Sequence, residues 1–431
     1  MNTPSSGNNP ISLDHDITLT SEEKAMLAGE LGPARRYAME QIIRVGGFFD
    51  AKDCIEVSQV HIMADPESLG LAGVEFLESL CALEADQRRV RVPTVTDPRG
   101  VDFEAYKRLG QTEEQANLER RAITAFKAMG IMMTDTCINY QTIMPPVRGE
   151  HIAYGDTGSS IYANSVMGAR TNFQGGPSAL AAALAGRVPR YGYHLDQCRR
   201  GSRLFDLSFR PDDLSEWGAV GGIIGGFMES YWDVPVVTGV DGTPTSDEMK
   251  QIGAALASYG STALFHMVGV TPEAPDLSSV FDGPPPKSIS IGRAEVEAFL
   301  ASYRPSDDQL DVVVFAAPQL SLVEMETLAG LLDGKKINPS VALLVATSPE
   351  IKNACDRMGF TAKIETAGGI VLKGVCFYQM YAREIGEAQG WKRLMSNSAK
   401  LVNIIGGYGY EPLLASMEKC VESAVKGRII T

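Results

Sequence analysis

The sequence predicts an α/β fold built from parallel sheets with helices on both faces. The clearest sign is the C-terminal third, where apolar runs at residues 311–315 and 341–346 are predicted strands. Amphipathic segments at residues 320–332 and 349–360 alternate with them and are predicted helices. Such alternation is typical of parallel strands joined by crossover helices. A length of 431 residues with 44% hydrophobic content allows several such units.

The N-terminal half carries helix-start signals followed by short apolar runs. Thr20 and Glu23 have the spacing of a capping box, and Pro33 suits the first position of a second helix that ends near Gly46. A further helix is expected over residues 113–129. The strands expected in this half span residues 54–62, 90–95 and 130–135, the last leading directly into Cys137.

The middle of the chain is rich in glycine at residues 218–227. This segment matches neither a P-loop nor a dinucleotide-binding fingerprint. Close packing of backbone against backbone is therefore favoured over an anion cradle. Thr245 is expected to begin a helix that ends near Gly260, and residues 261–270 are a predicted strand.

Four regions follow from these signals. Residues 1–16 are polar and are expected to form a disordered tail. A first α/β region is expected at 17–230, a middle region with a proline-rich linker at 231–306, and a C-terminal region at 307–431.

The composition limits the possible partners. The net charge is −14, with 39 basic against 53 acidic residues and no basic run. We therefore expect no nucleic-acid and no membrane partner, although local arginines can still bind a small anion. No apolar run reaches the ~18 residues of a membrane span, and the N-terminus lacks an apolar signal core. Seven scattered cysteines without a CxxC pair fit a reducing compartment, so the expected location is cytoplasmic.

Sites in parallel sheets lie at the carboxyl ends of strands. Three loops are placed there by the prediction, at residues 134–140, 269–275 and 316–321. A fourth segment, YANSVMGARTN at residues 162–172, is unusually rich in short hydrogen-bonding side chains. Its Arg170 offers a planar fork that matches a carboxylate or a phosphate. The alternative is that these polar groups cap turns.

These segments together resemble the large subunit of aconitase X, and the resemblance covers nearly the whole chain. The motifs that carry it are TCINY, GEHIAY, YANSVMGARTN, GGPSALAAALAGRVPRYGYHLD and GVTPEAP. It implies aconitase-like three-layer α/β/α domains around a central cleft. It also implies a hydro-lyase whose swivelling domain is a separate small subunit, because the chain ends after CVESAVKGRIIT. We therefore expect a heterodimer.

The resemblance also implies site residues and a cofactor. The family binds iron or an iron–sulfur cluster, held largely by cysteines. The expected metal ligands are Cys137, Cys376 and Cys420. The expected substrate-binding residues are Asn164, Ser165, Arg170, Thr171, Asn172 and Ser398. The candidate catalytic residues are His151, His266 and Lys400.

The sequence departs from the family at three positions of its metal-site motifs. Ala317 and Gln319 stand where the family commonly has cysteine and histidine, and Gly374 stands where it has an acidic residue. Alanine cannot ligate a metal, and glutamine cannot shuttle protons as histidine does. Both an iron-dependent site and a metal-free one therefore remain open.

The first hypothesis for function is the large subunit of a dehydratase acting on a small hydroxy acid such as cis-3-hydroxy-L-proline. An alternative is a diverged, metal-free relative that works as an isomerase or another lyase in a specialised pathway. Dehydration of mevalonate 5-phosphate and a non-enzymatic RNA-binding role are less favoured. The acidic composition argues against the last.

Overall fold

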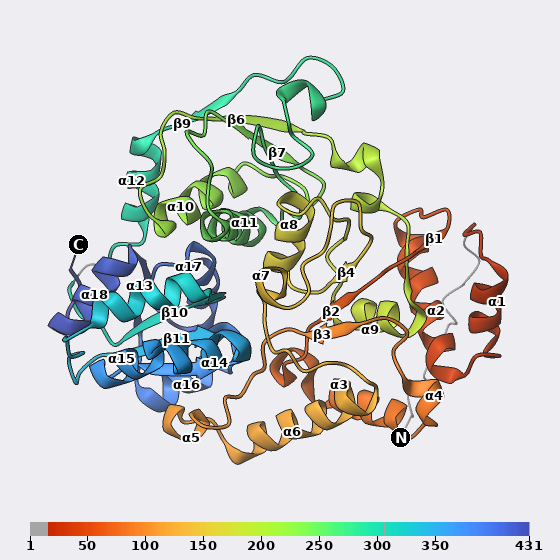
Figure 1. Cartoon of the computed structure of the whole chain (residues 1–431), viewed down its shortest axis with the longest axis horizontal. Coiled ribbons are helices and arrows are strands. Elements are labelled where there is room, and N and C mark those ends of the chain that lie inside the picture. Colours follow the sequence, from red (N-terminus) through yellow and green to blue (C-terminus); the bar gives the residue numbers. More distant parts are fainter. Residues whose placement is uncertain (1–15, 306, 431) are drawn as a thin grey trace, which may run out of the picture.

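In the computed structural model, which describes residues 16–305 and 307–430, three parallel sheets organise the chain into three lobes (Figure 1). Helix α8 (Thr157–Ser165) lies near the middle of the picture, between these lobes. Within the described ranges, no helix is long and apolar enough to cross a membrane. Of the tail expected at residues 1–16, only Asp16 belongs to the described part of the chain.

The C-terminal lobe contains a five-stranded parallel sheet with the order β12-β11-β10-β13-β14. Its strands are β10 (Val312–Leu320), β11 (Ala342–Thr347), β12 (Ile370–Lys373), β13 (Arg393–Ser396) and β14 (Glu411–Leu414). Its helices are α13 (Leu322–Leu332), α14 (Pro349–Met358), α15 (Phe360–Ala367), α16 (Ala382–Gln389), α17 (Ala399–Ile405) and α18 (Met417–Lys426). The strands and helices predicted here are confirmed.

Alternate residues of β10 pack on opposite faces of this sheet, as expected for a strand buried on both sides. Val313 and Phe315 share a core with residues of α13, α14 and α18. Val312 and Val314 share a second core with residues of α16 and α17. Helices on both faces explain why the run at 312–316 is uniformly apolar.

The middle lobe contains a four-stranded parallel sheet with the order β8-β7-β6-β9. Its strands are β6 (Arg203–Leu207), β7 (Pro235–Thr238), β8 (His266–Met267) and β9 (Ile289–Ile291), and its helices are α10 (Leu214–Gly225), α11 (Ser246–Gly260) and α12 (Arg293–Ser302). Because β6 pairs with β7, the boundary expected after residue 230 runs through this sheet, and β6 belongs with the middle lobe. The strand expected at 261–270 is confined to the two residues of β8.

Glycines bring α10 and α11 into backbone contact. A Cβ added at Gly221 would lie 2.4 Å from the Ile252 carbonyl oxygen, and one at Gly225 would lie 3.0 Å from the Gly260 nitrogen. No side chain fits at either position. The prediction of close packing in the glycine-rich segment is confirmed.

The first lobe contains a three-stranded parallel sheet, β3-β2-β4, and an antiparallel pair, β1-β5. Its strands are β1 (Cys54–Glu56), β2 (Val60–Ile62), β3 (Thr94–Thr96), β4 (Ala153–Tyr154) and β5 (Arg187–Pro189). Its helices are α1 (Ser21–Ala28), α2 (Pro33–Phe48), α3 (Pro66–Cys81), α4 (Ala85–Arg88), α5 (Tyr106–Leu109), α6 (Glu113–Ala128), α7 (Asn139–Thr142), α8 and α9 (Gly176–Ala185). The capping box at Thr20 is present.

Two expected strands of this lobe differ from the structure. The run at 54–62 divides into β1 and β2, which belong to different sheets. The run at 130–135 makes a single bridge, between Met132 and Val95. It then turns away, because Asp135 adopts a positive φ of 52° and the Thr134 amide donates to the Thr96 hydroxyl.

One carboxyl group of this lobe is buried and accepts few hydrogen bonds. Glu119 on α6 is fully buried, and its Oε2 accepts a hydrogen bond from the Gly100 amide at 2.9 Å. Burial raises its pKa to about 8, against the opposing effect of nearby Arg99. A carboxyl with a raised pKa holds its proton in the folded state where the unfolded chain has already lost it.

We therefore expect the free energy of unfolding to fall as pH rises from about 4.5 to 8, and Glu119→Gln to remove part of that fall. Glutamine keeps an acceptor for the Gly100 amide and cannot ionise. Urea titrations at pH 5.5 and 8.5 should show a difference smaller by about 2–4 kcal/mol in the variant. Glu114→Gln, on the exposed face of α6, is the control and should leave the difference unchanged. An unaltered pH dependence in Glu119→Gln would contradict this account.

Candidate functional site

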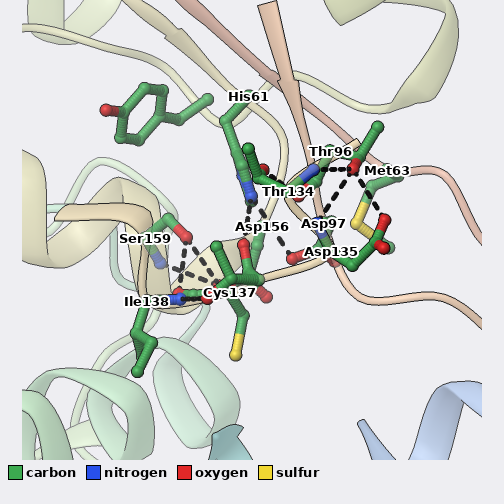
Figure 2. A network of polar contacts seen from close by, with 12 residues as sticks. His61, Met63, Thr96, Asp97, Thr134, Asp135, Cys137, Ile138, Asp156 and Ser159 are labelled. Carbon is green, nitrogen blue, oxygen red and sulfur yellow. Dashed lines mark hydrogen bonds and ion pairs between the residues drawn. The ribbon is translucent and has the colours of Figure 1, made fainter. Parts of the chain in front are cut away.

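A cluster of buried ionisable side chains lies where the first and C-terminal lobes meet. It contains His61 on β2, Asp97 after β3, Asp156 before α8, and Lys400 on α17. Two thiols, Cys137 and Cys376, join it from loops of the two lobes. Figure 2 shows His61, Asp97, Asp156 and Cys137 converging from separate segments. The parallel sheets explain this convergence, since the segments that follow β3, β4 and β12 carry Asp97, Asp156 and Cys376 to one place.

Asp156 is an ionised carboxylate held by a buried cation. As the N-cap of α8, its Oδ2 accepts a hydrogen bond from the Ser159 amide at 2.8 Å, and its Oδ1 lies 3.2 Å from Lys400 Nζ. Burial alone would raise its pKa, but the positive charge of Lys400 and the Ser159 hydrogen bond outweigh burial and hold the pKa below the usual value. The same pairing raises the pKa of Lys400 against the effect of burial. Both groups are therefore charged at neutral pH.

Asp97 lies in the same cluster and has the opposite tendency. It is fully buried, and its Oδ2 accepts one hydrogen bond from Gln379 Nε2 at 2.8 Å. Burial, followed by repulsion from the charge of Asp156, raises its pKa well above the usual range. Two carboxyl groups whose surroundings drive their pKa values apart form a recognised basis for acid–base chemistry. Asp97 is the member whose surroundings favour the protonated form.

His61, on β2, lies next to Asp97 and to the loop after residue 134. Its Nε2 lies 2.8 Å from the Thr136 carbonyl oxygen and 3.5 Å from Asp97 Oδ1 (Figure 2). A carbonyl partner requires a proton on Nε2, and burial lowers the pKa of the ring, so the imidazole is neutral. Its Nδ1 has no hydrogen-bond partner among the described residues. Through the contact with Thr136, His61 holds the loop after residue 134 beside Asp97.

The two expected thiol ligands of the loops, Cys137 and Cys376, are brought together. Their side chains are in contact, and burial followed by that contact raises the pKa of Cys137 well above its usual range. Gln319 holds both loops. Its backbone N–H donates to Cys137 Sγ at 3.3 Å. Its side-chain Nε2 donates to the carbonyl oxygens of Asp135 and Val375, each at 3.1 Å.

The third expected ligand does not join them. Cys420 is buried on α18, where its thiol lies 3.7 Å from the Ala415 carbonyl oxygen. Across residues 16–305 and 307–430, no group of three or more His, Cys, Asp or Glu side chains is placed to hold a metal ion. The donor set therefore does not fit an iron group held by the three expected thiolates. Ala317, within β10, supplies no thiol to complete the pair.

Gly374 has a spatial reason for lacking the acidic side chain of the family motif. Its φ is +70°, and an added Cβ would lie 2.9 Å from Asp135 Cβ and 3.1 Å from Arg99 Nη2. Asp135 itself pairs with Arg99 at 2.9 Å in that space. An ion pair made by another segment thus occupies the volume that a side chain at residue 374 would need.

The short polar side chains Asn164, Ser165, Thr171 and Asn172 bind mainly backbone groups, away from the cluster. Asn164 donates to the carbonyl oxygens of Thr171 and Ala263, both at 2.8 Å, and Asn172 donates to that of Tyr191 at 3.0 Å. Ser165 accepts from the Phe265 amide at 2.9 Å. The Thr171 hydroxyl accepts from the Tyr154 amide and donates to the Asn172 carbonyl oxygen. These contacts match the alternative in which the polar groups cap turns.

The other expected site residues are divided between two places. Lys400 belongs to the cluster, and Ser398, which begins α17, donates to the Ala317 carbonyl oxygen at 2.5 Å. Arg170 pairs with Asp196 outside the cluster. His151 Nδ1 lies 2.9 Å from His194 Nδ1, and His266 Nε2 lies 2.7 Å from the Arg199 carbonyl oxygen. Neither of these two candidate catalytic histidines reaches Asp97 or Asp156.

Sequence reasoning missed Asp97, although a signal was present. The segment TVTD places an acidic residue directly after a buried strand, where side chains of parallel sheets converge. The loop at 134–140 was singled out for the same reason, and its contacts with Gln319 confirm that it meets the loop at 316–321. The third loop, 269–275, contributes Glu273 to a different cavity.

Comparisons with known proteins show which family this chain resembles. Family models described as the first, second and third domains of aconitase X match residues 16–197, 201–301 and 310–426. The large subunit of phosphomevalonate dehydratase from Methanothermobacter thermautotrophicus is 35% identical over 91% of this chain and 94% of that protein. Cis-3-hydroxy-L-proline dehydratase from Pseudomonas aeruginosa is 31% identical over 97% of this chain and 72% of that protein.

A solved structure agrees with these matches. Aconitase X from Thermococcus kodakaraensis, in its holo-form, superposes with a TM-score of 0.83 at 28% identity, covering 95% of this chain and all of that one. The predicted aconitase-like α/β fold is thereby confirmed. With all three family domains matched in order, the chain belongs to the aconitase X family of large subunits and is a lyase of the dehydratase type.

Proposed function

We propose that this chain is the catalytic large subunit of a dehydratase that removes water from a small hydroxy acid at the Asp97–Asp156–Lys400 cluster. The observation that carries the proposal is the juxtaposition, in a buried site, of a carboxyl group whose pKa is raised and a second carboxyl group that pairs with a lysine. The names of the relatives support the reaction class.

The roles of the residues follow from their protonation states. Dehydration needs a base for the α-proton and an acid for the departing hydroxide. Asp97, as the protonated member, donates its proton to the hydroxide, so that water leaves as the carbon–carbon double bond forms. Lys400, held by Asp156 and 5.6 Å from the Tyr378 ring centroid, offers positive charge to the substrate carboxylate. The base that receives the α-proton comes from the small partner subunit in this proposal.

The partner is proposed from the names of the relatives, several of which are large subunits. We propose a small swivelling-domain subunit that closes over the cluster, in the cytoplasm. An iron group would act as a Lewis acid on the departing hydroxyl in a family member with a complete site. The donors of this chain do not match the three-thiolate set, and no step above depends on iron.

Cis-3-hydroxy-L-proline is the proposed substrate, and mevalonate 5-phosphate is the second candidate. Relatives named for each reaction match nearly the whole chain. A diverged isomerase or lyase is the other reading, favoured by Ala317 and Gln319 at family metal-site positions. Each of these proposed reactions would use the same cluster, so assays with the different substrates distinguish between them.

We expect Asp97→Asn to lower kcat about 10²- to 10⁴-fold, because asparagine is isosteric with the protonated carboxyl but cannot give up a proton to the leaving group. The protein, co-expressed with its small subunit, is assayed with cis-3-hydroxy-L-proline and with mevalonate 5-phosphate. Glu119→Gln, which alters another buried carboxyl far along α6, is the matched control and should retain activity. Full activity in Asp97→Asn would refute the assigned role. Turnover of neither substrate by the wild type would favour the diverged reading.

Lys400→Met is expected to destabilise the protein by about 3–5 kcal/mol, because Asp156 then remains buried without its cation. Asp156→Asn in the same chain removes that orphaned charge and keeps an N-cap for α8, so the double variant should recover most of the loss. Urea denaturation of the two single variants and the double variant measures the coupling. Strict additivity would mean that the 3.2 Å pair contributes nothing as a pair.

Ala317→Cys is expected to increase the iron retained per chain after anaerobic reconstitution and gel filtration. The Gln319 amide donates to Cys137 Sγ, so the end of β10 lies beside the thiol pair, and a third thiol there moves the donor set toward one that suits iron. Iron content and thiolate-to-iron absorption are measured. Cys420→Ser is the control and should not change either. Equal iron in wild type and Ala317→Cys would show that residue 317 lies outside any metal site.

A further inference from the structure

The short 3₁₀ helix η4 (Phe377–Gln379), which follows β12, carries several side chains to the cluster. Cys376, directly before it, supplies one of the two thiols, and Gln379 Nε2 donates to Asp97 Oδ2 at 2.8 Å. The Gln379 amide also donates to the Cys376 carbonyl oxygen at 2.9 Å, and Phe377 is fully buried in a core of the C-terminal lobe. Tyr378 lies between these fixed neighbours, so its position is well defined.

Tyr378 lies beside the charged pair of the site. Lys400 Nζ is 5.6 Å from the centroid of its ring. Burial, followed by the negative charge of Asp156, raises the pKa of the phenol well above the usual range, and Cys376 and Asp97 act in the same direction. Charges act this strongly only on a group that lies close to them. The phenol therefore belongs to the Asp97–Asp156–Lys400 cluster.

The phenol differs from the charged members of the cluster in its access to solvent. Asp97, Asp156 and Lys400 are at most 4% exposed, and each already has a partner within the protein. Tyr378 is only partly buried. Within the described ranges its hydroxyl makes no hydrogen bond, and it is not one of the side-chain atoms that are sealed from solvent without a partner, as His61 Nδ1 is. The hydroxyl is thus open to a ligand.

We infer that Tyr378 binds the substrate directly, its hydroxyl donating a hydrogen bond to the carboxylate that Lys400 also holds. The inference rests on the proposed function and adds a second donor to the site. A carboxylate has two oxygens, so one can face the ammonium group of Lys400 while the other accepts from the phenol. Because Asp156 already balances the charge of Lys400, a neutral donor strengthens carboxylate binding without adding a charge to a buried site.

This pair of donors fits a singly charged carboxylate better than a dianion, because Lys400 is already paired with Asp156. Cis-3-hydroxy-L-proline and mevalonate 5-phosphate both carry a carboxylate, so the inference applies to either candidate substrate. The other possible role of Tyr378 is structural, in which its ring only shields Lys400 from water. A phenylalanine ring would shield Lys400 equally well, so removal of the hydroxyl alone separates the two roles.

The test is Tyr378→Phe in the complex of this chain with its small subunit, because phenylalanine keeps the ring beside Lys400 and removes only the hydroxyl. Loss of one hydrogen bond to a charged group should lower kcat/KM about 10- to 100-fold, mainly through a raised KM. Tyr381→Phe is the matched control, since Tyr381 is also partly exposed but its phenol lies near Glu119 and Glu67. The control should keep the kcat/KM of the wild type.

Two kinetic results would overturn the inference. One is a kcat/KM for Tyr378→Phe within about twofold of the wild type, and the other is an equal loss in Tyr381→Phe. Turnover by the wild type is measured first with both candidate substrates, and its absence would contradict the proposed function itself.

If the wild type turns over neither substrate, binding of L-proline is measured by calorimetry, because L-proline has the carboxylate but no hydroxyl group to lose. Binding to Tyr378→Phe that is about tenfold weaker than to the wild type would support the inference. Equal binding by the two proteins, or no binding by the wild type at about 10 mM, would overturn it.

Discussion

The ion pair between Asp156 and Lys400 is the constraint on which the centre of this molecule depends. Asp156 comes from the first lobe and Lys400 from the C-terminal lobe, and their 3.2 Å contact is fully enclosed. A buried charge is tolerated only when it is paired and hydrogen-bonded. Separating the two lobes would expose both partners or strand one of them. The pair therefore fixes the relative position of the lobes and the electrostatics of the cluster together.

Asp97 shows how one pair determines the state of its neighbours. Burial raises its pKa, and the negative charge of nearby Asp156 raises it further. Gln379 supplies a single neutral donor in place of a cation. If Asp97 were in contact with a lysine, as Asp156 is, the positive charge would favour its ionised form. The two carboxyl groups therefore differ in pKa because Lys400 pairs with Asp156 and not with Asp97.

Much of the fold could be predicted from sequence, because local signals and packing agree there. The capping box at Thr20 and the alternation over residues 311–360 appear in the structure as expected. The prediction of a strand at 130–135 was wrong because of a tertiary contact, in which the Thr134 amide donates to the Thr96 hydroxyl. The cluster was only partly foreseen. Asp97 and Lys400 are far apart in sequence, and only the sheets bring them together. Asn164, Ser165, Thr171 and Asn172 were conspicuous, but they bond mainly to backbone groups that no local pattern identifies.

Helix α8 has one more consequence, which concerns ionic strength. Its segment TGSSIYANS is polar yet almost entirely buried, and its two ends bind Lys400 through Asp156 and Arg199 through Asn164. Dissolved ions screen exposed charges over about 10 Å at 0.1 M salt but reach buried pairs much less. The net charge of −14 makes the exposed charges of this protein sensitive to ionic strength. Its central helix is insulated from dissolved ions, so the geometry of the site stays constant while the surface responds.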